Sequence, residues 1–115
     1  MGHDKLLSML GICRKAGYLV LGSDAVIEAL RKESAHIVLL TDDLSRRSGE
    51  KIATAADHKS VKGLKIPISM EEIERLTGKA SGIIAITDKG LADAVEKLAR
   101  ASADNQRPTN EEGTI

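Results

Sequence analysis

Apolar and polar residues follow one another in two different periods along this chain. Residues 4–16 carry apolar side chains at positions 6, 7, 9, 10 and 13, which is the spacing of an amphipathic helix. Short apolar runs recur further on, and such runs are typical of strands covered on both faces. The predicted strands lie at residues 18–21, 36–41, 64–68 and 82–86. The predicted helices lie at residues 4–16, 23–30, 45–59, 69–77 and from 88 to about 101.

Residues that start and stop helices support these boundaries. Gly17 follows two cations in the last helical turn, Arg14 and Lys15, and is expected to end the first helix. Ser69 is followed three residues later by Glu72, which is the pattern of a capping box at a helix start.

The alternation of helices and strands predicts the α/β class. We expect a three-layer α/β/α sandwich on a small mixed four-stranded sheet, mostly parallel with some antiparallel pairing. Pro67 lacks an N–H, so its strand is expected at an edge of the sheet or to end there. Residues 1–101 are expected to form a single domain, and residues 102–115 a polar, disordered tail.

The composition limits the classes of function that the chain can have. The chain of 115 residues has 17 basic and 17 acidic side chains, so binding to nucleic acid needs a local patch of positive charge. One tyrosine is the whole aromatic content, which excludes the base-stacking surfaces of many single-strand binders. No apolar run reaches the ~20 residues of a membrane span, and there is no signal-peptide pattern, so we expect a cytoplasmic protein with no membrane partner.

The sequence carries no catalytic signature: a Walker loop, G-x-G-x-x-G and G-x-S-x-G are all absent. Cys13 lies on the apolar stripe of the first helix and is expected to be a buried, inert thiol. His36 begins a buried strand and His58 lies near a helix end, so both are expected to be structural. Asp42 and Asp43 end a strand, and we expect one of them to cap the following helix rather than to hold a metal. We therefore expect no enzyme activity, no cofactor and no metal.

The segment Gly22-Ser23-Asp24 is the first candidate site. Glycine lets another molecule come close to the backbone, and the N–H groups at a helix start have no partner within the helix. Capping by Ser23 or Asp24 would satisfy one or two of these donors, and the others can meet water, a phosphate or a base edge. A simply capped helix and an open helix mouth are both compatible with this segment.

Nearby cations favour the open mouth. Arg46 and Arg47 are predicted in the first turn of a helix, where each opposes the helix dipole by a few tenths to ~1 kcal/mol. Their placement becomes favourable when an anion from another molecule sits among them. Further cations in the sequence are Arg14, Lys15 and Lys79. They would complete a rim of positive charge around the helix mouth if the order of the strands brings these segments together.

Five segments carry a resemblance to a known family, namely "RKAGYLVLG", "SDAVIEALRK", "HIVLLTDD", "KIPIS" and "IERLTGKASGIIAITDKGLADAV". In this order they resemble the ribosomal protein L7Ae/L30e superfamily, and most of all its bacterial YlxQ-type branch. The resemblance covers roughly residues 4–100. It implies an α/β/α sandwich and, for many members, binding of kink-turn RNA, a helix–bulge–helix with tandem sheared G·A pairs.

The family recognises this RNA through a Gly-x-Asn-Glu pattern and a lysine three residues later. The resemblance places the glycine at Gly22, and the asparagine, glutamate and lysine positions at Asp24, Ala25 and Glu28. An aspartate still accepts hydrogen bonds from a guanine edge but donates none, an alanine makes none, and a glutamate reverses a charge near phosphates. In the resemblance, the start of the third helix corresponds to Ser45 and Arg46. The loop that covers a flipped-out nucleotide corresponds to Lys79, Ala80 and Ser81.

We therefore expect a non-catalytic, monomeric RNA-binding protein connected with translation, whose partner is a structured RNA, kink-turn-like or ribosomal, or the ribosome itself. The expected RNA-binding residues are Gly22, Ser23, Asp24, Arg14, Lys15, Ser45, Arg46, Arg47, Lys79, Ala80 and Ser81. The alternative is a protein-interaction module on the same fold that has lost RNA binding. Asp24, Ala25, Glu28 and the zero net charge favour that alternative.

Overall fold

The structure is a computed structural model that describes the backbone of residues 2–106 and the side chains of residues 4–102. Helices and strands alternate along this part of the chain. The elements are α1 (Gly2–Ala16), β1 (Leu19–Leu21), α2 (Ser23–Arg31), β2 (Ile37–Leu40), α3 (Arg46–His58), β3 (Lys62–Lys65), α4 (Met70–Thr77), β4 (Ile83–Ile86) and α5 (Lys89–Gln106).

The four described strands form one mixed sheet in the order β1-β4-β2-β3. β4 pairs antiparallel with both β1 and β2, and β2 pairs parallel with β3. The mixed four-stranded sheet is confirmed, but the expectation that it is mostly parallel is wrong. The reason is that β4 returns between β1 and β2 in the opposite direction, which the apolar pattern of a strand does not encode.

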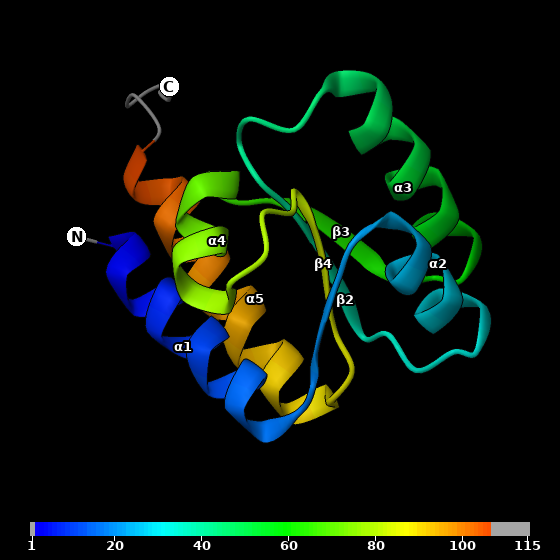
Figure 1. The fold of residues 1–115 in the computed structure, drawn as a ribbon, viewed down its shortest axis with the longest axis horizontal. Coiled ribbons are helices and arrows are strands. Elements are labelled where there is room, and N and C mark those ends of the chain that lie inside the picture. The colour runs from blue at the N-terminus through cyan, green and yellow to red at the C-terminus, as the bar shows by residue number, and fades with distance from the viewer. Residues whose placement is uncertain (1, 107–115) are drawn as a thin grey trace, which may run out of the picture.

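The sheet lies between two helix layers, and the three-layer sandwich is confirmed. Helices α1, α4 and α5 cover one face, and α2 and α3 cover the other (Figure 1). The strand β2 is buried on both sides because its side chains alternate between the two cores. Ile37 and Leu39 pack with the first layer, and Val38 packs with the second.

The strand β3 begins and ends earlier than the apolar pattern predicts. It covers Lys62–Lys65 rather than 64–68, and it lies at the edge of the sheet, as Pro67 indicates. Ile66 and Ile68 are nevertheless almost fully buried, and the Ile66 N–H donates to the Leu40 carbonyl at 2.8 Å. Apolar side chains therefore remain buried beyond the end of β3, and for this reason the apolar pattern predicted the strand too late in the sequence.

The last helix extends beyond its predicted end. Residues 102–106 were expected to begin a disordered tail, but they belong to α5, and Ser102 is only 2% exposed. The alanines on either side of Ser102 favour helix, and its small side chain fits against the core. The rest of the predicted tail, residues 107–115, lies outside the described residues.

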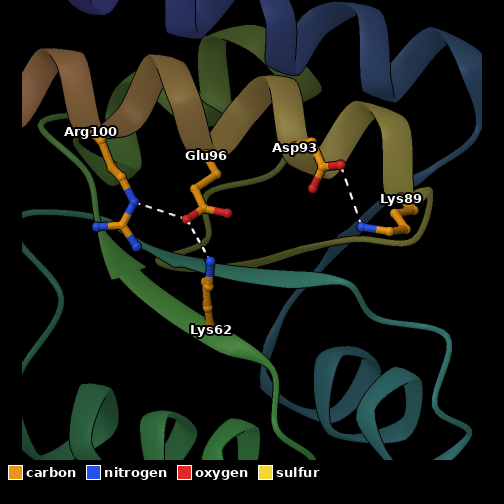
Figure 2. Close-up of polar contacts among 5 residues, drawn as sticks. All are labelled: Lys62, Lys89, Asp93, Glu96 and Arg100. Carbon is orange, nitrogen blue, oxygen red and sulfur yellow. Dashed lines mark hydrogen bonds and ion pairs between the residues drawn. The ribbon is translucent and has the colours of Figure 1, made fainter.

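The edge strand is tied to α5 by charged side chains. Lys62 on β3 and Arg100 on α5 both contact the Glu96 carboxylate at 2.9 Å (Figure 2). Hydrogen bonds from these two cations hold the pKa of Glu96 below its ordinary value. Figure 2 also shows the ion pair of Lys89 and Asp93, which lies earlier on α5 than Glu96.

Several expected side-chain roles can now be compared with the structure. Cys13 is fully buried, and desolvation raises the pKa of its thiol, as expected for an inert cysteine. His36 and His58 are both exposed. The Asp43 carboxylate accepts from the Met70 N–H at 3.1 and 3.3 Å, so it caps α4 rather than the helix that follows it.

The described residues offer neither a metal site nor a membrane-spanning helix. They contain no cluster of three or more histidine, cysteine or carboxylate side chains placed to hold a metal ion. None of their helices is both long enough and apolar enough to cross a bilayer.

Candidate nucleic-acid interface

The sheet brings the ends of several strands together. Because β1 and β2 both run opposite to β4, their last residues, Leu21 and Leu40, pair with the first two residues of β4, Ile84 and Ile83. The Gly22 N–H, just after β1, donates to the Ile83 carbonyl at 2.9 Å, and the Thr41 N–H, just after β2, donates to the Gly82 carbonyl at 3.0 Å. We name this the mouth end of the sheet, since the N-terminus of α2 opens there.

Gly22 is the N-cap of α2 and has φ 98° and ψ 151°, a conformation that is essentially restricted to glycine. Its carbonyl accepts from the Val26 N–H at 2.9 Å. Ser23 and Asp24 lie in the first helical turn, and among the described residues no side chain caps α2. The capping role expected for these two residues is therefore absent there, and the helix mouth is open.

Lys79 lies beside this mouth. A Cβ added to Gly22 would be 3.6 Å from the Lys79 Nζ, so the cation borders the space over the glycine. Thr77 ties the loop to α4, because its hydroxyl has the Ile73 carbonyl at 2.8 Å and the Lys79 carbonyl at 3.1 Å as acceptors, and it accepts from the Lys79 N–H at 3.2 Å. Within the part of the chain that the structure describes, Lys79 makes no ion pair.

The next two residues of this loop differ in their access to a partner. Ala80 is exposed, whereas Ser81 is only 8% exposed. The Ser81 hydroxyl donates to the Ile83 carbonyl at 3.0 Å and accepts from the Ile83 N–H at 3.3 Å. Ser81 therefore shapes the loop, and its hydroxyl is already engaged within the protein.

The start of α3 lies at the mouth end as well. The Ser45 hydroxyl caps the helix by accepting from the Ser48 N–H at 3.2 Å, so one predicted contact residue has a structural partner. Arg46 is 92% exposed and contacts Glu50 at 3.1 Å. Arg47 is exposed and makes no ion pair with any described residue.

Gly82 connects the loop of Lys79 to the start of α3. A Cβ at this position would lie 2.7 Å from Leu44 Cδ1 and 2.9 Å from the Thr41 hydroxyl oxygen. An added methyl group would therefore have to displace the side chains of Leu44 and Thr41. The backbone before β4 therefore packs directly against the side chain that precedes α3.

Arg14 and Lys15 lie at the opposite end of the sheet. A hydrogen bond from the Tyr18 N–H to the Cys13 carbonyl closes the turn between α1 and β1. The first residue of β1 pairs with the last residue of β4. Figure 1 shows the end of α1 beside the beginning of α5, far from the start of α2. The expected rim of cations around Gly22 therefore excludes Arg14 and Lys15, since strand direction decides their position.

The outward face of α2 carries two cations that the sequence interpretation missed. The Arg31 Nε donates to Glu28 Oε1 at 3.1 Å, its Nη2 donates to Oε2 at 2.7 Å, and the Lys32 Nζ lies 3.8 Å from Oε2. The hydrogen bond from Arg31 lowers the pKa of Glu28. Arg31 and Lys32 follow Glu28 by three and four residues, and this spacing was the sequence signal for both ion pairs.

An open helix mouth on a three-layer sandwich, with Lys79 beside it and two exposed arginines at the same end of the sheet, is a surface suited to an anionic polymer. The chain belongs to the ribosomal protein L7Ae/L30e/S12e/Gadd45 family, whose model matches residues 4–96. The resemblance inferred from the sequence is thereby confirmed.

Two relatives are both named RNA-binding protein YlxQ. One, from Enterococcus faecium, is 28% identical over 96 residues, which cover 84% of this chain and 92% of that protein. The other, from Bacillus subtilis (strain 168), is 30% identical over 95 residues, which cover 78% of this chain and 90% of that protein.

Solved structures have the same fold. A protein of unknown function from Bacillus halodurans superimposes with a TM-score of 0.76 at 22% identity, over 84% of this chain and 97% of that one. The 15.5kD RNA binding protein of Giardia lamblia superimposes with a TM-score of 0.68 at 14% identity, over 90% and 88%. Identities this low support the shared architecture only.

Proposed function

We propose that the protein is a non-catalytic RNA-binding protein, and that it binds a structured RNA of the kink-turn type at the mouth end of its sheet. The names of the two YlxQ relatives support RNA binding, and the family supports the fold on which it occurs. Ribosome association, a role in translation, a monomeric state and a cytoplasmic location remain predictions from the sequence.

The uncapped N-terminus of α2, with the Lys79 Nζ beside Gly22, is the observation that carries this proposal. Free backbone N–H groups at a helix start attract phosphate oxygens and other acceptors, and a nearby ammonium group strengthens that attraction. The glycine lets the RNA backbone or a base edge come within hydrogen-bond distance of these donors.

Base reading at this site would differ from that of the family pattern. Asp24 is exposed and has only acceptor oxygens, so it suits the N1–H and N2–H groups of a guanine. Ala25, at the glutamate position, is exposed and offers no polar group. We therefore expect phosphate contacts to supply more of the affinity here, and base contacts less.

The large apolar side chains most open to solvent lie away from the mouth end. Ile12 is 52% exposed and Tyr18 is 41% exposed, and these are the large apolar side chains most open to solvent among the described residues. Both lie on α1 or in the turn after it, next to the opposite end of the sheet. A protein partner that docks on these two side chains would therefore bind away from Gly22.

A titration onto a fluorescent kink-turn RNA, beside a plain duplex of the same length, tests the proposal at two salt concentrations. We expect binding that prefers the kink-turn and weakens steeply with salt. Equal and weak binding to both RNAs would refute the proposal and favour the protein-interaction module.

A further inference from the structure

Three charged side chains follow the outward face of α2 from its mouth. Asp24, Glu28 and Arg31 are spaced by four and three residues, so they share one face of the helix. The opposite face carries Val26 and Leu30, which are buried against the sheet. The side chain of Glu28 is 44% exposed and that of Arg31 is 69% exposed, so this stripe is available to a partner.

The pair of Glu28 and Arg31 has a geometry that the other described arginine pairs lack. Arg31 engages both carboxylate oxygens, with distances of 3.1 and 2.7 Å. Arg46 and Arg100 each contact a single carboxylate oxygen of their partners through Nε. Two parallel hydrogen bonds fix the plane of a guanidinium group as well as its position.

This geometry leaves Arg31 able to bind an anion. A guanidinium has five N–H groups, and the pair with Glu28 uses one at Nε and one at Nη2. Within the described residues nothing accepts from Nη1. An RNA phosphate approaching this face would therefore meet ordered N–H donors instead of an unneutralised carboxylate.

We propose that Glu28 is a positioning residue that holds the Arg31 guanidinium against α2, where Arg31 binds a phosphate of the RNA seated at the helix mouth. Arg31 is nine residues beyond Gly22, about 13 Å along the helix axis. The contact therefore falls on the RNA backbone outside the segment at the mouth. This inference rests on the proposed function and adds a second point of contact to it.

A double-mutant cycle tests the inference in the full chain, using R31Q, E28Q and the variant with both substitutions. The measurements are the dissociation constant for the kink-turn RNA at 0.1 M salt and the slope of its salt dependence. R31Q should weaken binding about eightfold and lower the slope by about one, because one phosphate contact is lost. D93Q, on the pair with Lys89 in the other helix layer, is the control and should bind like the wild type.

The effect of E28Q depends on its background. In the R31Q background it should tighten binding, because a lone carboxylate near phosphates is removed. In the wild-type background it should leave binding equal or weaker, because a gain in net charge is offset by the loss of an ordered guanidinium. Circular dichroism of each variant checks that the fold is retained.

Three outcomes overturn the inference. R31Q binding like the wild type would remove Arg31 from the interface. E28Q tightening binding by the same factor in both backgrounds would show that Glu28 only repels RNA. A wild-type protein without salt-dependent preference for the kink-turn would overturn the proposed function as well, which distinguishes that failure from the first two.

Discussion

Replacing Gly22 by alanine separates a role in RNA binding from a role in folding. The φ of 98° and ψ of 151° lie in a region that other residues occupy at a cost of order 1–3 kcal/mol. An added Cβ meets only the flexible end of Lys79, at 3.6 Å, so steric overlap adds little to this cost. A domain of this size has about 5–15 kcal/mol of stability, so G22A should remain folded.

Urea unfolding followed by circular dichroism measures the first effect. With a denaturant slope of about 1–3 kcal/mol per molar urea, the midpoint of G22A should fall by roughly 1 M. RNA affinity should fall more than tenfold, because the methyl group occupies the approach to the α2 N–H groups. The affinity is measured by the kink-turn titration at a temperature where the variant is fully folded.

G17A is the matched control. Gly17 also has a positive φ, 85°, and no atom would lie within 4 Å of an added Cβ, but it ends α1 at the opposite end of the sheet. Its left-handed backbone should cost about 1–2 kcal/mol in stability and leave RNA binding unchanged. If G22A binds RNA like the wild type, or if G17A loses affinity to the same extent, the open mouth is not the binding site.

Three further predictions concern charges. R46E combined with R47E should weaken RNA binding and flatten its salt dependence, while thermal unfolding changes little because both side chains are exposed; unchanged affinity would remove the start of α3 from the interface. D43A should lower the unfolding free energy by about 1 kcal/mol, measured in urea, because the first N–H of α4 loses its acceptor. Because the pKa of Glu96 is lowered, its ion pairs stabilise the fold fully above the ordinary value of 4.5. This stabilisation is lost as the pH falls through the lowered pKa. The E96Q variant should therefore lose less stability in acid than the wild type, as measured by urea unfolding at several pH values.

The sequence predicted well those features that depend on neighbouring residues. The capping box of Ser69 and Glu72 is present with both of its hydrogen bonds, because it needs only two residues three positions apart at one helix start. The positive φ of Gly17 follows equally from local helix ending.

Features that depend on strand direction could not be predicted in this way. The exclusion of Arg14 and Lys15 from the candidate interface follows from the antiparallel pairing of β1 with β4. The contact of Lys79 with the space over Gly22 depends on the same pairing, and from the sequence Lys79 was only a nearby cation whose position the sheet order would decide. The bidentate pair of Glu28 and Arg31 was visible as a spacing, but its geometry required coordinates.

The composition of β3 affects how copies of the protein behave at high concentration. An edge strand exposes a row of backbone groups that another strand can extend, and this is a common route to fibrous aggregates. β3 is four residues long, and lysines stand at both of its ends. Two copies aligned along this edge would place like charges against each other, so the strand disfavours polymerisation while its backbone stays uncovered.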